Sequence, residues 1–174
     1  MSSELQDKAR AVTCVIMDCD GVLTDGRAFY SGNEIGVFFN VHDGAGIKYL
    51  GRVGLKTAII SGRETEAVSR RARELGIDEV IQGAKVKIDA YRDLTERLDL
   101  RDEQACYIAD DLTDMPVLRE VGLAVAVPNA RSEVREMADM ITETRGGEGA
   151  VRELAEFILK TQGKWDKIME RYVE

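Results

Sequence analysis

The amino-acid sequence predicts an α/β fold: a Rossmann-like three-layer α/β/α sandwich with a mostly parallel sheet. Apolar segments of strand length alternate along the chain with segments of helix length, an order typical of parallel sheets covered on both faces. The first apolar segment, residues 11–17, is rich in β-branched residues, as expected of a strand buried on both sides. The 174 residues fit one core, so we expect a single domain over residues 1–174.

A small β-hairpin is predicted over residues 28–40, inserted after the first strand. Two apolar, aromatic runs at 28–30 and 37–40 flank residues 31–34, where Gly and Asn tolerate the positive φ angles of a tight turn. The hairpin is too rich in aromatic side chains to remain uncovered in water. We therefore expect another surface to bury it.

The remaining elements follow in alternation. Strands are expected at 57–60, 80–81, 105–108, 123–127 and 140–142. Helices are expected at 43–52, 64–75, 87–98, 115–121, from 132 onwards, and at 150–161. Asp43 is predicted to cap the first of these helices, and Gly54 and Gly76 to end two of them. The polar composition of residues 163–174 predicts a frayed C-terminal tail; a docking contact through Trp165, the only tryptophan, is the alternative.

Charge and composition exclude several classes of partner. The formal net charge is −8 at pH 7, which disfavours binding to nucleic acid or to an anionic membrane. Apolar stretches are far shorter than the ~20 residues of a membrane-spanning helix, and the first residues lack the apolar region of a signal peptide. We therefore expect a cytoplasmic protein. Cys14, Cys19 and Cys106 show no metal-site or redox spacing and are expected to be reduced.

Two carboxylates stand two residues apart where the first strand ends, at Asp18 and Asp20, and Gly21 follows them. Because the carboxyl ends of parallel strands meet at one edge of the sheet, these acids are expected where such folds bind ligands. Alone, the pair could simply cap a turn. Three further segments, each after another predicted strand, favour a functional site instead: Ser61-Gly62-Arg63, Lys87, and Asp110-Asp111-Leu112-Thr113-Asp114.

The convergence of so many acids predicts a bound cation. Two like charges about 4 Å apart repel by about 4 kcal/mol at an effective dielectric constant of 20. A hard cation such as Mg²⁺ binds carboxylates, a backbone carbonyl and waters, and so compensates this repulsion. We therefore expect Mg²⁺ as the cofactor.

The same side chains suit phosphoryl transfer, which needs a nucleophile, a proton donor for the leaving oxygen, and cations around the phosphoryl oxygens. Asp18 suits the nucleophile that forms an aspartyl-phosphate. Asp20 suits the acid that protonates the leaving group and then takes a proton from water. Ser61 and the Gly62 amide can donate hydrogen bonds to the phosphoryl group, and Lys87 can neutralise a further oxygen. Each of the last three would be an ordinary turn or surface residue alone; their order favours the functional interpretation.

The order of these motifs resembles the four-motif pattern of the haloacid dehalogenase superfamily of Mg²⁺-dependent phosphotransferases. Over nearly the whole chain the sequence also looks like the 3-deoxy-D-manno-octulosonate 8-phosphate (KDO 8-phosphate) phosphatase family. The segments that carry this closer resemblance are DCDGVLTDG at 18–26, FNVHDG at 39–44, SGR at 61–63, Gln82-Gly83 with Lys87, DDLTDMP at 110–116, and RGGEGAVRE at 145–153.

The resemblance implies a phosphomonoesterase acting on a phosphorylated 2-keto-3-deoxy sugar acid, most closely KDO 8-phosphate, with a place in lipopolysaccharide biosynthesis. It assigns the metal ligands as the Asp18 carboxylate, the Asp20 backbone oxygen and the Asp110 carboxylate. Asp111 and Asp114 then surround these ligands without binding the metal directly, or are linked to the site through water.

Candidate substrate-binding residues lie outside the acid cluster. Arg63 and Arg145 can bind the carboxylate of the substrate, because guanidinium groups bind carboxylates through two hydrogen bonds; a plain surface arginine is the alternative for each. His42, the only histidine, is a candidate substrate-binding residue rather than a metal ligand. Lys85 is a rival for the lysine role, but the spacing in the resembled family favours Lys87.

Two positions depart from the family pattern. Ala109 stands where a glycine usually precedes the aspartate pair, and His42 stands where arginine is common. The second departure leaves open a nine-carbon sugar acid 9-phosphate, of the KDN or sialic acid type, as substrate. Two further alternatives are considered. One is a phospho-accepting signalling receiver, but in that class the acceptor aspartate follows the third strand, where this chain has no counterpart. The other is a catalytically idle relative.

Only about 25 residues separate Gly21 from Ile47, too few for the separate cap domain that many relatives have. The resembled family forms homotetramers in which the hairpin covers a neighbour's active site, with the C-terminal tail near Trp165 also reaching it. We expect the hairpin at 28–40 to be buried in the same way.

Overall fold

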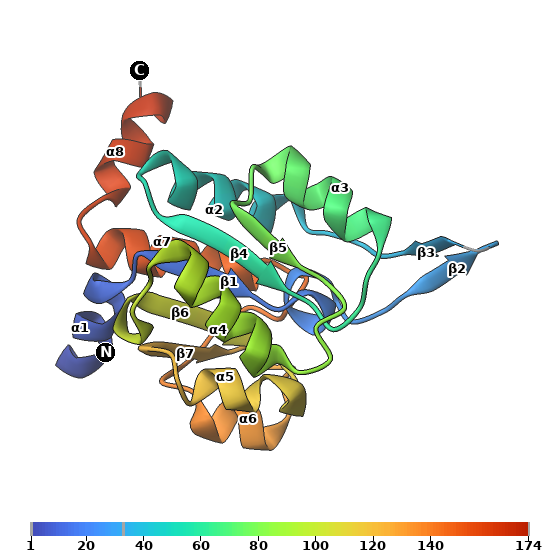
Figure 1. Cartoon of the computed structure of the whole chain (residues 1–174). Coiled ribbons are helices and arrows are strands. Elements are labelled where there is room, and N and C mark those ends of the chain that lie inside the picture. The colour runs from blue at the N-terminus through green and yellow to red at the C-terminus, as the bar shows by residue number, and fades with distance from the viewer. Residues whose placement is uncertain (1, 33, 174) are drawn as a thin grey trace.

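A six-stranded sheet with the strand order β5-β4-β1-β6-β7-β8 lies at the centre of the structure, a computed structural model that describes residues 2–32 and 34–173 (Figure 1). All neighbouring strands in this sheet run parallel. The strands are β1 (Cys14–Met17), β4 (Lys56–Ile60), β5 (Glu79–Ile81), β6 (Ala105–Ala109), β7 (Leu123–Ala126) and β8 (Met140–Ile141). The predicted α/β class and parallel sheet are confirmed.

Helices cover both faces of the sheet (Figure 1). One face carries α1 (Ser3–Ala11), α2 (Val41–Arg52), α3 (Glu66–Leu75) and α7 (Ala150–Thr161); the other carries α4 (Lys87–Leu98), α5 (Met115–Leu118) and α6 (Ser132–Met137). Right-handed crossovers place helices on opposite faces when the chain reverses its direction across the sheet. That reversal lies at β1, which has β4 on one side and β6 on the other. The carboxyl end of β1 is therefore the position at which such sheets bind ligands.

The core is formed by the central strands, which are buried on both faces. Every residue of β1, β6 and β7 is buried, as is β4 after its first residue. This matches the continuous apolar runs in the sequence, because a strand covered by helices on both sides has no polar face. Cys14, Cys19 and Cys106 belong to this core and are free thiols, as predicted.

Two helices, α4 and α7, begin and end at the predicted residues, whereas the start of the chain differs from the prediction. The first strand was predicted over 11–17, but Ser3–Ala11 forms α1 and β1 starts only at Cys14. Ser2 caps α1 by accepting a hydrogen bond from Leu5 N at 3.2 Å. The sequence of α1 is polar and charged, so it lacks the clear apolar periodicity from which the other helices were predicted.

The cap of α2 also differs from the prediction. The side chain of Asn40, rather than Asp43, accepts the capping hydrogen bond, from His42 N at 2.8 Å. Asp43 is buried one turn later and accepts from Arg152 N at 2.9 Å, at the start of α7. The carboxylate thus serves the N-terminus of a different helix, where an acid interacts favourably with the helix dipole. Among the other helices, α3 starts at Glu66 and α5 ends at Leu118, each shorter than predicted.

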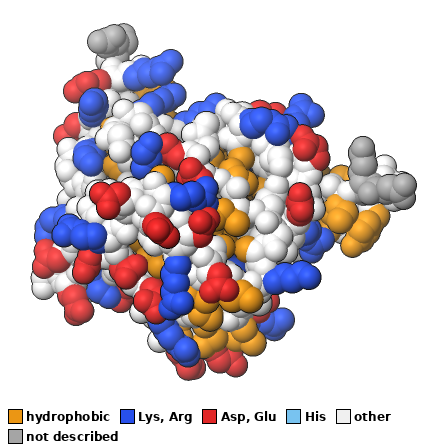
Figure 2. Space-filling model, viewed as in Figure 1, with side chains coloured by type: hydrophobic (Ala, Val, Ile, Leu, Met, Phe, Trp, Pro, Cys, Tyr) orange, Lys and Arg blue, Asp and Glu red, His pale blue; other side chains and the backbone are white. Residues whose placement is uncertain are grey.

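The predicted hairpin is present and projects away from the sandwich (Figure 1). It pairs β2 (Phe29–Ser31) with β3 (Glu34–Gly36), so its second strand starts three residues earlier than predicted; Asn33, part of the predicted turn, lies outside the described residues. Phe29, Tyr30 and Phe38 are 48%, 72% and 66% exposed. Figure 2 shows the hydrophobic side chains on this projecting arm. In the described chain, β1 and α2 are joined only by the turn η1 (Cys19–Leu23) and this hairpin, with no cap domain.

Residues 163–173 of the C-terminal tail are ordered, so for these residues the prediction of a frayed end is wrong and the docking alternative is correct. Residues of the tail form α8 (Trp165–Met169) and η4 (Glu170–Tyr172). The Trp165 ring meets Tyr49 of α2 edge-on, with ring centroids 6.0 Å apart, and Ile168 is buried. Arg152 of α7 lies over both rings, at 4.6 Å from Tyr49 and 5.9 Å from Trp165.

Within the part of the chain that the structure describes, no helix combines the length and the apolar character needed to cross a membrane.

We predict that Trp165→Ala lowers the free energy of unfolding by about 2 kcal/mol. The same change at a fully buried aromatic costs about 3–5 kcal/mol, and Trp165 is only partly buried. Urea denaturation followed by circular dichroism measures this. Val173→Ala is the matched control in the same tail, because Val173 is 74% exposed and should cost less than about 1 kcal/mol. Equal stabilities of Trp165→Ala and the unmodified protein would show that the tail does not dock in solution.

Candidate active site

The polar segments at the carboxyl edge of the sheet converge as the sequence predicts. Asp18 follows β1, Gly62 follows β4, Lys87 starts α4 after β5, and Asp110 follows β6. These residues line one open cavity of about 540 Å³. The full lining is Asp18, Asp20, Gly26, Gly62, Arg63, Lys87, Asp110, Asp111 and Thr113.

A buried ion-pair network fixes the candidate nucleophile. The Lys87 ammonium donates to Asp18 Oδ1 at 2.6 Å and to Asp114 Oδ1 at 2.5 Å. All three side chains are buried. Burial alone would lower the pKa of Lys87, but the two carboxylates outweigh it and the pKa lies above its usual value. Lys87 is therefore a fixed cation that holds Asp18, in addition to any contact with a phosphoryl oxygen.

Asp114 anchors this lysine. Its Oδ1 accepts a second hydrogen bond from the Tyr107 hydroxyl at 2.7 Å, and its Oδ2 accepts from Asp111 N at 3.2 Å. Tyr107 lies in the fully buried strand β6 and was not predicted to belong to the site. A tyrosine in a strand buried on both faces was the available signal, because a buried hydroxyl needs a partner.

Together, the carboxylates around Lys87 carry more negative charge than its single ammonium group neutralises. Burial, and then the nearby Asp114, raise the pKa of Asp18 well above its usual value, and the same two causes raise the pKa of Asp110 to about 6. Asp110 Oδ1 is buried without a hydrogen-bond partner among the described residues. Asp18, Asp110 and Asp114 each offer an oxygen within 4.8 Å of the others. An unpartnered buried carboxylate oxygen in such a cluster fits a hard divalent cation.

The oxygens available for this cation favour the predicted ligand set. Both oxygens of Asp114 are already used in hydrogen bonds, whereas Asp110 Oδ1 is free. Gly21, directly after Asp20, has φ +92°, and a Cβ there would lie 2.0 Å from Asp110 Oδ2. Only glycine therefore lets the Asp20-Gly21 backbone approach the Asp110 carboxylate so closely.

Asp20 and Arg63 form an ion pair at the cavity, with Arg63 Nε donating to Asp20 Oδ2 at 2.9 Å. This contact with Asp20 is the main cause of the raised pKa of Arg63. Ser61 is buried, and its hydroxyl oxygen accepts from Arg63 N at 3.3 Å. Ser61 thus lies behind Gly62, and its hydroxyl supports the loop that presents Gly62 and Arg63.

Three predicted residues do not line the cavity: Ser61, which is buried, and Arg145 and His42, which are exposed. Arg145 is 61% exposed, and its nearest carboxylate, Glu148, lies 3.9 Å away. His42 is exposed at the start of α2. The loop that carries Arg145 does touch the site, because Gly147 N donates to Val22 O at 2.8 Å. The roles proposed for Ser61, Arg145 and His42 stay predictions.

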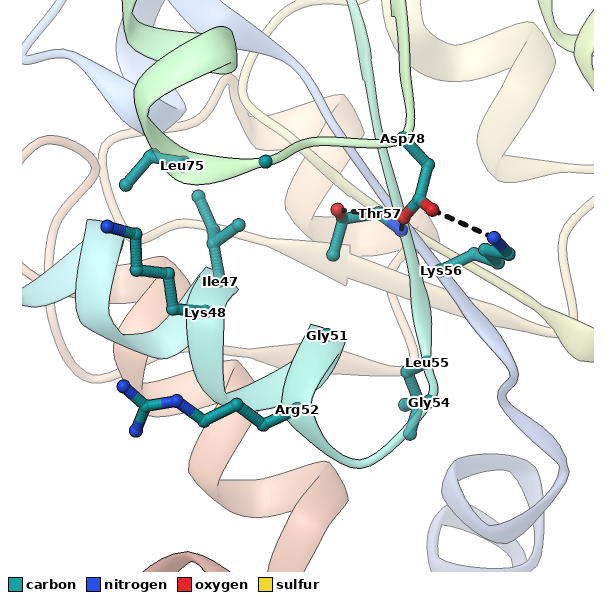
Figure 3. A pocket seen from close by; sticks show the side chains of 11 residues that line it. Ile47, Lys48, Gly51, Arg52, Gly54, Leu55, Lys56, Thr57, Leu75 and Asp78 are labelled. Carbon is teal, nitrogen blue, oxygen red and sulfur yellow. Dashed lines mark hydrogen bonds and ion pairs between the residues drawn. The ribbon is translucent and has the colours of Figure 1, made fainter.

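A second depression, of about 420 Å³, lies at the opposite edge of the sheet, where β4 begins (Figure 3). Asp78 is the only acid among its lining residues. Its Oδ1 accepts from Lys56 Nζ at 2.9 Å, and its Oδ2 accepts from Thr57 N at 2.9 Å. The acid is thus fully engaged, and this depression lacks the free carboxylates of the first cavity.

Comparisons with known proteins agree with this geometry. The sequence is 40% identical, over 96% of this chain and 89% of the relative, to the 3-deoxy-D-manno-octulosonate 8-phosphate phosphatase of Escherichia coli strain B. The chain belongs to the KDO 8-phosphate phosphatase family. A family model described as haloacid dehalogenase-like hydrolase also matches residues 79–154, the span that holds Lys87, Asp110 and Asp114. The chain is thus a phosphatase, and the alternative interpretation as a phospho-accepting signalling receiver is excluded.

Solved structures give the same result for the KDO 8-phosphate phosphatase family. The chain is 39% identical, with a TM-score of 0.96 and 99% coverage of both chains, to the KDO 8-phosphate phosphatase of Moraxella catarrhalis in complex with magnesium ion, phosphate ion and KDO. It is 46% identical, with the same TM-score and coverage, to a probable YrbI family phosphatase of Pseudomonas syringae pv. phaseolica. The fold predicted by the family resemblance is confirmed.

We predict that Mg²⁺ at ~100-fold above its Kd stabilises the protein by about 2.7 kcal/mol, seen as a raised melting temperature. Asp110→Asn should abolish this shift, whereas Asp78→Asn, which alters an acid in the other depression, should keep it. At pH 5 the shift should shrink, because Asp110, with a pKa of about 6, is then mostly protonated and the proton competes with the metal. An undiminished shift in Asp110→Asn would place the cation elsewhere.

Proposed function

We propose that this chain is a Mg²⁺-dependent phosphomonoesterase that hydrolyses KDO 8-phosphate through an aspartyl-phosphate on Asp18. The observation that carries the proposal is the buried Asp18 carboxylate, held by Lys87 beside the unpartnered oxygen of Asp110 at the bottom of an open cavity. The solved relative from Moraxella catarrhalis, described with magnesium, phosphate and KDO, supports the choice of metal and sugar acid.

In the first half-reaction the Asp18 carboxylate attacks phosphorus, and the bond between phosphorus and the sugar oxygen breaks. Asp20 gives its proton to that oxygen, so the sugar acid leaves as an alcohol. Lys87 keeps Asp18 in position and lowers the negative charge that the incoming phosphate meets. When bound, Mg²⁺ neutralises charge on the phosphoryl oxygens and on the carboxylates that hold the metal.

In the second half-reaction water attacks phosphorus of the aspartyl-phosphate. Asp20, now a carboxylate, takes the proton of that water, and inorganic phosphate leaves as Asp18 is restored. Arg63 holds one oxygen of Asp20, which fixes the direction of the carboxyl group. One side chain thus serves as acid and then as base in the same place.

The carboxylate of the sugar acid is better matched to Arg145 than to Arg63. Arg63 is engaged at Asp20, next to the phosphate end of the substrate, whereas the carboxylate of KDO 8-phosphate stands at the other end of the carbon chain. Arg145 is exposed and has no ion pair closer than 3.9 Å among the described residues. A nine-carbon sugar acid 9-phosphate stays the alternative substrate, because His42 lies outside the cavity and does not discriminate between the two.

A panel of phosphorylated compounds with Mg²⁺ tests the function. We predict that KDO 8-phosphate is hydrolysed with a kcat/KM at least about tenfold above that of a neutral hexose 6-phosphate, because one added ion pair is worth about 1.4 kcal/mol or more. Asp18→Asn should reduce turnover to background while keeping the fold. Equal efficiency on both classes, or higher efficiency on a nine-carbon substrate, would contradict the assignment.

We also propose that the active form is a homotetramer in which the hairpin is buried. The exposed aromatic side chains on β2 and just after β3 support this, since such a patch favours association. The cytoplasmic location, the place in lipopolysaccharide biosynthesis and the reach of the tail into a neighbouring site stay predictions.

We predict that replacing both Tyr30 and Phe38 by serine reduces the assembled species, as measured by light scattering over a concentration series. Turnover should fall in parallel with assembly. Val80→Ser, on the edge strand β5, changes an exposed apolar side chain outside the hairpin and should leave assembly unchanged. A fully active monomer at assay concentration would overturn the proposed assembly.

A further inference from the structure

The side chain of Asn129 bridges two loops of the active site. Asn129 lies in the connection between β7 and α6 and is half-buried. Its Nδ2 donates to Gly21 O at 2.9 Å, and its Oδ1 accepts from Gly146 N at 2.8 Å. Both ends of one amide are therefore used, each on the backbone of a different loop. The first loop carries Asp18 and Asp20, and the second carries Arg145.

The two loops are in direct backbone contact at this position. A Cβ on Gly146 would lie 1.7 Å from Gly21 O, and Gly147 N donates to Val22 O at 2.8 Å. A small shift of either loop would therefore press on the other. The amide of Asn129 ties them together at the carbonyl of Gly21, the residue that follows Asp20.

The segment that carries Asn129 also touches the third acidic segment. Arg131 N donates to Asp110 O at 2.8 Å, and Val127 N donates to Ala109 O at 3.2 Å. Residues 127–131 thus contact the backbone beside Asp20, the backbone of Asp110 and the loop of Arg145. The geometry links three separate parts of the cavity to one short connection.

We propose that Asn129 is a positioning residue for the phosphatase reaction. Its donor half fixes the Gly21 carbonyl, and through this residue the adjacent Asp20, for the chemical step. Its acceptor half fixes the loop that carries Arg145, and hence the recognition of the substrate carboxylate. The second part rests on the proposed function. The amide supplies both halves, whereas a carboxylate offers only acceptors and an aliphatic side chain offers neither.

Two variants separate the two halves. Asn129→Asp keeps an acceptor for Gly146 N–H but removes the donor to Gly21 O, whereas Asn129→Ala removes both. Gln162→Ala is the matched control. The Gln162 amide also binds two backbone groups, donating to Ala9 O at 3.0 Å and Val12 O at 2.8 Å, but it joins α7 to α1 far from the cavity.

Kinetics are measured with KDO 8-phosphate and with p-nitrophenyl phosphate, which has no carboxylate. Both Asn129 variants should lose about tenfold or more in kcat on both substrates, because Asp20 is less well placed. Asn129→Ala should in addition raise the KM for KDO 8-phosphate about fivefold while the KM for p-nitrophenyl phosphate changes less than about twofold. In Asn129→Asp both KM values should stay within about twofold, and Gln162→Ala should keep all values within about twofold.

Hydrogen exchange of the metal-free protein provides a second readout. In Asn129→Ala the amides of residues 145–147 should exchange about tenfold faster, while those of β1 and β6 keep their protection. If kinetics and exchange in both Asn129 variants match those of Gln162→Ala, Asn129 has no positioning role. If the unmodified protein does not hydrolyse KDO 8-phosphate, the proposed function fails, whereas a loss of kcat on p-nitrophenyl phosphate still tests the donor half.

Discussion

The site depends on the buried ion pairs that Lys87 makes with Asp18 and Asp114. A charged group away from water is strongly unfavourable unless partners surround it, so these three side chains have to come together when the chain folds. With Asp110, the cluster contains three carboxylates and one ammonium, an excess of two negative charges that one divalent cation balances. Without metal, the site therefore carries uncompensated negative charge at one point. This charge favours the binding of a divalent cation, and the bound cation in turn favours the binding of a phosphate.

Topology explains why this cluster can form at all. The four segments that supply it follow β1, β4, β5 and β6, which are neighbours in the sheet although they lie far apart in the sequence. Because the helices change face at β1, the edge beside Asp18 is not covered by a crossover helix. Within residues 2–32 and 34–173 the only insertion there is a short hairpin, and the cavity stays open in the isolated chain.

Local signals sufficed to predict the carboxyl ends of β1, β4 and β5, the bounds of α4 and α7, and the positions of Asp18, Gly62 and Asp110 at one edge of the sheet. The choice of Lys87 over Lys85 came from the family resemblance. Tyr107 and Asn129 were missed because their roles come from partners in other segments, at Asp114, Gly21 and Gly146. The tail around Trp165 was misjudged for the same reason: its polar sequence says nothing of Tyr49 on α2, against which the Trp165 ring packs.

The strand order has a consequence for the way the protein is made. β1 pairs on one side with β6, so Cys14 lies opposite Ala105, and Asp18 donates its backbone N–H to Ile108 O. Asp18 thus leaves the ribosome well before β6, although β6 forms one side of its surroundings. Such long-range parallel pairing is slow, because a large loop has to close before any contact compensates its lost entropy. A nascent chain that ends before β6 therefore carries the acids Asp18 and Asp20 without their binding site, and it acquires catalytic competence only late in synthesis.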